Sequence, residues 1–261
     1  MTSVHLRHFG EGTVSLLALH CGQGVGSMWR DLARGLPQLR VTAPDLPGHG
    51  RSDPFPDGED VHDVATAAMR PLFDGPMHLI GHSFGATVAL RLALETPQQV
   101  LSLTLIEPVL FAAAADSPLK REKRAEQKLL QKTAQQGDWM ACAKMFNARW
   151  GGAAWEDLPE PMQQGFARQM PFVLGTAPTL WEDRAGLLAE GRLEQLAAPV
   201  HFLRGAKTDP MLRDIHSGLM ARLRNARETV VDGAGHMLLL THGADVARVM
   251  SQQLLAAGQT A

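Results

Sequence analysis

Short apolar runs alternate with segments of helical spacing along most of the chain. Each run ends at a turn signal or a polar loop, which is typical of buried strands. The expected strands are residues 14–19, 39–43, 77–80 and 101–106. Between them lie segments whose apolar residues repeat at helical spacing. These expected helices are residues 28–36, 61–72 and 84–95.

The same alternation returns near the end of the chain. Residues 200–203 and 228–231 are expected strands, and residues 212–223 and 244–255 are expected helices. Alternating strands and helices are typical of a mostly parallel sheet that has helices on both faces. The sequence therefore predicts an α/β fold.

The middle of the chain, residues 115–195, contains no convincing strand. Amphipathic, charge-rich stretches alternate there with a glycine pair and several prolines. We predict an all-helical insertion into a core domain made of residues 1–114 and 196–261. In the charge run 120–128, Glu122 and Glu126 interleave with the cations, which is typical of the solvated face of a helix.

Composition narrows the class of protein. Hydrophobic residues make up 45% of the 261 residues and charged residues 20%, as in ordinary globular proteins. The formal net charge is -2, so the chain has no excess of basic residues. This disfavours nucleic acid and anionic membranes as partners. We find no apolar stretch of the roughly 18 residues that a membrane span needs. Since the first apolar run also lacks a signal-peptide cleavage site, we expect a cytoplasmic protein.

The two cysteines, Cys21 and Cys142, have no CxxC spacing. This argues against a structural zinc site and against a disulfide framework, so we expect reduced thiols and no metal. The chain contains no tyrosine, and a phenol therefore cannot act as a catalytic acid or as an oxyanion donor.

The sharpest chemical signal is the G-x-S-x-G motif at residues 81–85, Gly-His-Ser-Phe-Gly. It follows an expected strand and begins an expected helix, which is the context of a nucleophile elbow. Glycines are needed on both sides because the turn is too tight for a side chain there. We predict that Ser83 is a nucleophile whose hydroxyl is exposed by this turn.

A serine hydroxyl needs a base, and the base needs a third group to orient it. Both should lie in loops at the carboxyl ends of later strands. Asp209 and His236 each follow such a strand, in the chain order Ser, acid, His that accompanies an elbow. We predict the triad Ser83, Asp209 and His236. Glu107, which follows the strand 101–106, is the rival acid, and Asp232 is a weaker one.

An oxyanion needs two backbone N–H donors. The first is expected from Phe84, directly after the nucleophile. The second is expected from Gly22, in the glycine-rich loop 20–24 that follows the first expected strand. A phosphate cradle is the alternative interpretation of this loop, but neither a GxGxxG motif nor a P-loop lysine accompanies it.

In these motifs the sequence resembles the α/β-hydrolase superfamily, in particular its small single-chain bacterial members with a helical lid. The resemblance covers residues 14–110 and 198–256. Its landmarks are His20-Cys-Gly-Gln-Gly24, Asp45-Leu-Pro-Gly-His-Gly-Arg-Ser-Asp53, Gly81-His-Ser-Phe-Gly85, Asp209-Pro210 and Gly233-Ala-Gly-His236. It implies a sheet of about eight strands, a helical lid (115–195) inserted after the sixth strand, and hydrolysis without a cofactor.

Two loops need a separate interpretation. The family usually has glycine where this chain has Cys21, so the thiol would alter the oxyanion geometry or fill a neighbouring gap. Asp45 and His49 have the appearance of a metal pair. We interpret their loop, 45–53, as a structural brace for the oxyanion loop.

The expected reaction is acyl transfer to water through an acyl-enzyme, on a carboxylic ester with a small to medium apolar acyl group (EC 3.1.1). A serine at the elbow disfavours the dehalogenases and epoxide hydrolases of the superfamily, which place a carboxylate there. Thioesterase, lactonase and carbon–carbon bond hydrolase remain alternatives on the same triad. A non-catalytic small-molecule receptor is the alternative from a different class.

Aromatic residues of the insertion, together with Met237 beside the base, are expected to form an apolar wall for a small-molecule substrate. The candidates are Phe146, Trp150, Trp155, Phe172, Trp181 and Met237. Three arginines are candidates for recognising an acidic group on a substrate or on a carrier protein, although exposed helix charges are the simpler interpretation. They are Arg149, Arg168 and Arg184.

Overall fold

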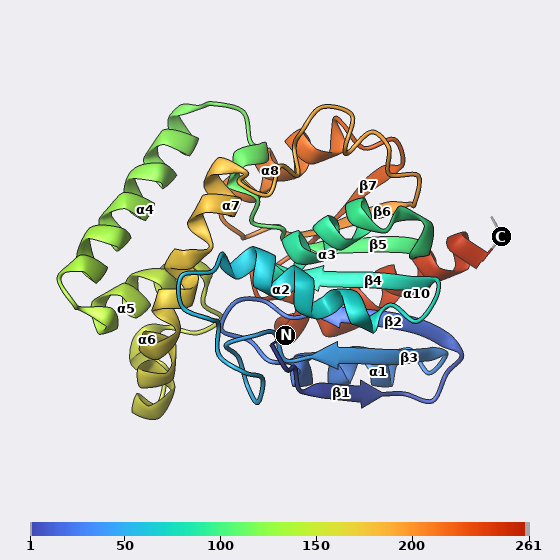
Figure 1. The fold of residues 1–261 in the computed structure, drawn as a ribbon, viewed down its shortest axis with the longest axis horizontal. Helices are drawn as coiled ribbons and strands as arrows, with labels where there is room; N and C mark the ends of the chain where they lie inside the picture. Colours follow the sequence, from blue (N-terminus) through green and yellow to red (C-terminus); the bar gives the residue numbers. More distant parts are fainter. Residues whose placement is uncertain (1, 259–261) are drawn as a thin grey trace.

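The computed structural model describes residues 2–258 and contains one central sheet with helices on both faces (Figure 1). The strands are β1 (Leu6–Phe9), β2 (Val14–Leu19), β3 (Leu39–Pro44), β4 (Met77–His82), β5 (Val100–Ile106), β6 (Val200–Gly205) and β7 (Ala226–Val231). Their order is β1-β3-β2-β4-β5-β6-β7, and all neighbours are parallel except β1 and β3. The predicted α/β class is confirmed, with seven strands in the described part of the chain instead of about eight.

Helices cover the two faces of the sheet. The first face carries α2 (Val61–Met69), α3 (Phe84–Glu95) and α8 (Met211–Met220), and the second carries α1 (Arg30–Gly35) and α10 (Gly243–Gly258). Three 3₁₀ turns, η1 (Gly26–Trp29), η2 (Arg70–Leu72) and η3 (Pro97–Gln99), and the short helix α9 (Leu238–Thr241) complete the core.

Strand β2 shows why the central strands are almost continuously apolar. Leu17 and Leu19 pack into the hydrophobic cluster on one face, while Leu16 and Ala18 pack into the cluster on the other. Successive side chains of a strand point to opposite faces, and here both faces are covered by helices. A buried strand of this sheet therefore needs apolar residues at every position.

Strand β1 was not predicted from the sequence. It is only four residues long, lies at the edge of the sheet and pairs antiparallel with β3. Its side chains are half-buried or exposed, and its sequence, Leu-Arg-His-Phe, has no apolar run. Pairing with an already formed neighbour, and not local hydrophobic pattern, makes this segment a strand.

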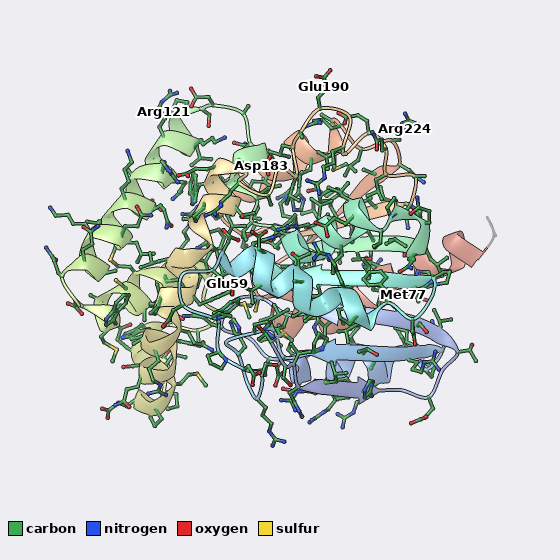
Figure 2. The ribbon with its side chains drawn as sticks, in the orientation of Figure 1. Glu59, Met77, Arg121, Asp183, Glu190 and Arg224 are labelled. Atoms are coloured by element: carbon green, nitrogen blue, oxygen red, sulfur yellow. The ribbon has the colours of Figure 1, made fainter. Side chains whose placement is uncertain are left out.

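The helical insertion lies between β5 and β6, after the fifth strand of the described sheet and not after the sixth (Figure 1). It begins after the short turn η4 (Phe111–Ala113) with α4 (Pro118–Gln135), which Ser117 caps by accepting a hydrogen bond from the Lys120 backbone. The chain continues through α5 (Trp139–Trp150), η5 (Trp155–Asp157), α6 (Glu160–Gly175) and α7 (Ala177–Glu182). Arg121 of α4 points away from the body of the molecule, as expected for a solvated face (Figure 2).

The insertion has a small hydrophobic cluster of its own, centred on residues such as Cys142, Met170 and Trp155. By contrast, Leu187 and Leu193, which lie within the predicted insertion 115–195, are fully buried in the cluster of the core. The segment that returns from α7 to β6 therefore packs as part of the core.

Gly85 allows α3 to approach the loop after β2. A methyl group at this position would clash with the backbone oxygens of Leu19 and His20. We expect Gly85→Ala to lower the free energy of unfolding by about 1–3 kcal/mol, as overpacking does elsewhere, measured by denaturant titration.

Gly165→Ala in α6 is the matched control. The nearest atom to a methyl group there is in the Arg168 side chain at 3.8 Å, so this variant should fold with unchanged or higher stability. Equal tolerance of both substitutions would contradict the close packing of α3 on β2.

Candidate active site

Ser83 sits on a sharp turn between β4 and α3. Its backbone is in the left-handed region, with φ 55° and ψ -116°, and its N–H donates to the Ile106 oxygen at 2.8 Å. Methyl groups on Gly81 or Gly85 would clash with backbone atoms, which explains both glycines of the motif. The turn has the strained conformation of a nucleophile elbow.

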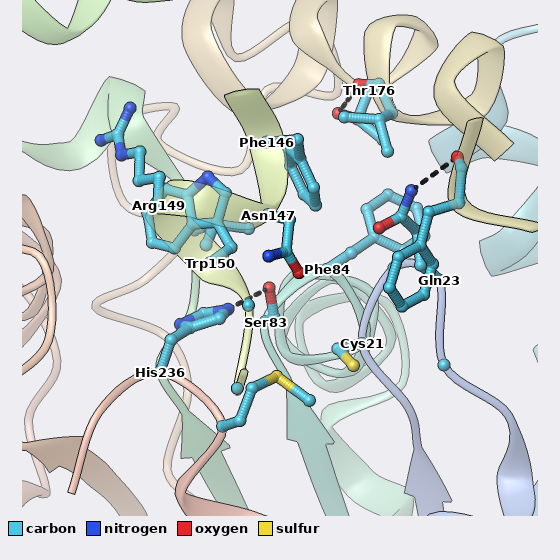
Figure 3. A pocket seen from close by; sticks show the side chains of 18 of the residues that line it. Cys21, Gln23, Ser83, Phe84, Phe146, Asn147, Arg149, Trp150, Thr176 and His236 are labelled. Carbon is cyan, nitrogen blue, oxygen red and sulfur yellow. Dashed lines mark hydrogen bonds between the residues drawn. The ribbon is translucent and has the colours of Figure 1, made fainter. Parts of the chain in front are cut away.

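His236 lies in the loop between β7 and α9, and its Nε2 is 3.0 Å from the Oγ of Ser83 (Figure 3). The neighbouring His82 donates from Nε2 to the His236 oxygen at 2.9 Å and so ties the loop to the elbow. Burial, and next the charge of His236, lower the pKa of His82 to about 3. His82 therefore remains neutral near pH 7.

The carboxylate that contacts His236 belongs to Glu107. Its Oε2 accepts from His236 Nδ1 at 2.9 Å and from the Thr208 hydroxyl at 2.6 Å, and its Oε1 accepts from the Gly205 N–H at 2.7 Å. Glu107 is fully buried and has φ 49°, an uncommon backbone conformation for a residue other than glycine. Ser83, His236 and Glu107 thus form one continuous chain of hydrogen bonds.

The prediction that Asp209 orients His236 is wrong. Asp209 lies at the start of α8, where its Oδ1 accepts from the Met211 N–H at 2.9 Å. Its Oδ2 pairs with Arg149 at 2.8 Å and lies 3.6 Å from the Lys123 ammonium group. Both carboxylate oxygens are thereby engaged away from the histidine.

Strand order explains why Glu107 takes the place next to His236. β5 is the direct neighbour of β4, so a residue at its carboxyl end lies beside the elbow. Asp209 comes four residues after β6, in the turn that leads into α8. Thr208 contacts the carboxylate of Glu107 instead. Thr208 was not singled out from the sequence, and no local signal marks it.

Phe84 and Gly22, the two residues expected to supply the oxyanion donors, line the same cavity as Ser83 and His236. Phe84 is the first residue of α3, and the N–H groups of a first helical turn have no acceptor within the helix. Gly22 follows β2, the other neighbour of β4, and is packed against the Phe172 ring, which a methyl group on Gly22 would meet at 3.2 Å.

The loop 45–53 contacts the oxyanion loop at several points. His20 accepts from the Leu46 N–H at 2.8 Å, and His49 accepts from the Gln23 N–H at 3.0 Å. Burial, and next the charge of His49, lower the pKa of His20 to about 3, so His20 stays a neutral acceptor. These bonds support the interpretation of the loop as a brace.

Asp45 is part of this brace. Burial by itself raises the carboxyl pKa, but hydrogen bonds from the Arg7 guanidinium and from the Gly26 and Arg51 N–H groups lower it below the usual value. Within residues 2–258, no cluster of three or more histidine, cysteine, aspartate or glutamate residues has a geometry that could hold a metal ion.

Cys21 is buried beside the elbow, and burial raises the pKa of its thiol to about 12. Because the thiolate is the reactive form, we expect the folded protein to resist alkylation of Cys21 by iodoacetamide at pH 8. The unfolded protein is the control and should react fully, as followed by peptide mass spectrometry. Rapid alkylation of Cys21 in the folded state would contradict this burial.

A cavity of about 830 Å³ opens above Ser83 and His236 and extends between the core and the insertion. Five of the six substrate-binding candidates line it, namely Phe146, Trp150, Phe172, Trp181 and Met237. Trp155 does not, because its side chain packs into the hydrophobic cluster of the insertion. Of the three candidate arginines, Arg149 lines the cavity, whereas Arg168 and Arg184 do not.

The cavity contains a polar side chain, Asn147, that was not predicted from the sequence to be a site residue. Asn147 of α5 is buried, and its amide nitrogen donates to the Ala153 oxygen at 3.0 Å. Figure 3 shows its amide group directed toward Ser83. An asparagine within a helix has no sequence signal that separates this position from a surface one.

Comparison with known families agrees with the geometry of the elbow. Residues 16–249 match the model of the alpha/beta hydrolase family. The chain belongs to this family. The match extends from β2 to α10, so this α/β hydrolase has the family fold on both sides of its helical insertion, as the motifs predicted.

Curated relatives of this α/β hydrolase include enzymes of several kinds. Lipase LipV from Mycobacterium tuberculosis is 38% identical over 123 residues, which cover 46% of this chain and 46% of the lipase. Pimeloyl-[acyl-carrier protein] methyl ester esterase from Nitrosomonas europaea is 33% identical, with 45% and 46% covered. A 2-hydroxy-6-oxononadienedioate/2-hydroxy-6-oxononatrienedioate hydrolase from Pseudomonas putida is 34% identical, with 40% and 39% covered. The chain spans less than half the length of these curated relatives.

Solved structures of similar fold match nearly the whole chain. A lipase structure from Acinetobacter baumannii has a TM-score of 0.74 at 21% identity and covers 100% of this chain and 93% of its own. An esterase from Exiguobacterium antarcticum has a TM-score of 0.72 at 18% identity and covers 96% and 95%. At this identity the likeness concerns the fold.

In the described part of the chain, no helix is both long and apolar enough to traverse a bilayer.

Proposed function

We propose that this α/β hydrolase is a serine carboxylic-ester hydrolase that uses Ser83, His236 and Glu107. The observation that carries the proposal is the continuous hydrogen-bonded chain from the Ser83 hydroxyl through His236 to Glu107, at the floor of an apolar cavity. Nucleophile, base and orienting acid in mutual contact are what acyl transfer requires.

In the proposed reaction, His236 Nε2 takes the proton of Ser83 as its Oγ attacks the carbonyl carbon. The N–H groups of Phe84 and Gly22 stabilise the oxyanion, and His236 then protonates the leaving alcohol. Water attacks the acyl-enzyme by the same path and releases the acid. Glu107 holds the imidazole with Nδ1–H toward its carboxylate and stabilises the imidazolium that forms.

The cavity favours an apolar acyl group. Its wall is formed by aromatic and aliphatic side chains of the insertion and core, and Asn147 and Gln23 are among its few polar members. The insertion covers this space and is proposed to act as a lid. An acidic group on the substrate has weak support, because Arg149 is already paired with Asp209 and Glu126.

The test is turnover of a nitrophenyl ester series from acetyl to decanoyl by the purified protein. We expect kcat/KM to rise from the acetyl ester to a maximum at a medium-length acyl group. Thioesters, lactones and vinylogous diketones, tested at equal concentration, should be slower. A protein that turns over none of the esters but cleaves a diketone would contradict ester hydrolysis and favour carbon–carbon bond cleavage. Absence of all turnover would favour a receptor.

A further inference from the structure

Asp209 connects the insertion to the core. It lies two residues before α8 of the core and accepts from the Met211 N–H at 2.9 Å. Its side chain, only 7% exposed, also accepts from Arg149 of α5 at 2.8 Å and approaches Lys123 of α4 at 3.6 Å. One carboxylate thus links two helices of the insertion to the first turn of a core helix.

The link continues to the active site through Arg149. Its guanidinium lies 4.4 Å from the centroid of the Trp150 ring, within the range of a cation–π contact. The Trp150 ring in turn lies 4.7 Å from the His236 ring, and Trp150 is 8% exposed (Figure 3). Asp209, Arg149, Trp150 and His236 are therefore in contact one after the other.

Arg149 depends strongly on Asp209 for its position. Its Nη1 is 3.3 Å from Glu126, a more exposed carboxylate, and its Nη2 is buried without a hydrogen-bond partner among the described residues. A guanidinium that is mostly buried and loses its nearest partner must move toward water, because an unpaired charge is costly away from it. Such a movement would carry the last turn of α5 with it.

We propose that Asp209 and Arg149 are positioning residues that anchor the last turn of α5 over the active site. That turn presents Trp150 to His236 and Asn147 to the cavity, so the anchor sets the shape of the substrate-binding wall without touching the reacting atoms. This inference rests on the proposed ester hydrolysis only for its kinetic readout.

The kinetic test compares Asp209→Asn, Arg149→Gln and the double variant on a medium-chain nitrophenyl ester. We expect each single variant to raise KM about tenfold and to change kcat less than about threefold, with the double variant no worse than either single one. Arg149→Lys should raise KM less than Arg149→Gln does, because lysine keeps the charge but not the planar stacking group. Arg168→Gln, an exposed arginine of α6, is the matched control and should leave KM unchanged.

The second readout does not depend on activity. Backbone hydrogen exchange across residues 147–152 should be faster in Asp209→Asn and Arg149→Gln than in wild type, and unchanged in Arg168→Gln. The anchor would be overturned if the KM increase of the double variant equalled the product of the increases of the two single variants. Unchanged exchange across residues 147–152 in Asp209→Asn and Arg149→Gln would also overturn it. A wild-type protein without esterase activity would refute the proposed function instead, and the exchange experiment would still decide the anchor.

Discussion

Glu107→Gln should lower kcat for ester hydrolysis by about 10³–10⁴-fold. A neutral amide cannot stabilise the imidazolium and favours the wrong histidine tautomer, and a comparable carboxylate-to-amide change in a serine protease has an effect of this size. The shape of the residue is preserved, so the hydrogen bond from the Gly205 N–H to its Oε1 can be retained. Steady-state kinetics with a nitrophenyl ester, together with circular dichroism to verify folding, measure the effect.

Asp209→Asn is the matched control for this experiment, since it makes the same chemical change at the acid predicted from the sequence. Asp209 contacts Arg149 and Met211 and not His236, so its kcat should stay within a few-fold of wild type. The reverse result, a large loss of kcat in Asp209→Asn and a mild effect of Glu107→Gln, would contradict the assignment of the acid.

Ser83→Ala should show the largest effect, a loss of about 10⁶-fold in kcat, as removal of the nucleophile does in a related triad. It should also abolish covalent labelling by a fluorophosphonate, which wild-type protein should take up at one equivalent per chain. Intact-protein and peptide mass spectrometry measure the stoichiometry and the modified residue. Thermal stability should change little, because the substitution removes one hydroxyl at the cavity floor.

A second serine provides the control for labelling. Ser15 of β2 accepts a hydrogen bond from Arg40 at the surface, and no histidine among residues 2–258 bonds to it, so Ser15→Ala should label as wild type does. Unlabelled wild-type protein, or label found on a residue other than Ser83, would contradict the proposed nucleophile.

Glu107 and Asp209, the two carboxylates that follow the neighbouring strands β5 and β6, have different partners in the structure. Glu107 is enclosed by donors from His236, Thr208 and Gly205, whereas Asp209 is drawn to the cations of the insertion. In the sequence both residues are acids that follow a strand. Which group each carboxylate binds depends on the cations and hydrogen-bond donors that the fold places near it. That choice depends on the position of α4 and α5, which are distant in the chain from Asp209.

Several features of this protein could be predicted because they depend on residues that are adjacent in the sequence. The strand, the two glycines and the helix around Ser83 form one short segment, so the turn that carries Ser83 could be predicted, as could the position of His236 at the end of a glycine-rich loop. Apolar runs and helical spacing likewise predicted the α/β class, because burial on both faces of a sheet leaves a pattern in the residues themselves.

Only the tertiary structure decided the features that depend on partners remote in sequence. The edge strand β1 exists because β3 is beside it, and Trp155 packs inside the insertion although its residue type suited the cavity. Glu107 and not Asp209 contacts His236 because β5 adjoins β4, while helices of the insertion bring Arg149 and Lys123 to Asp209. Residue type and spacing limit what each side chain can do, but strand order and packing determine which partner it meets.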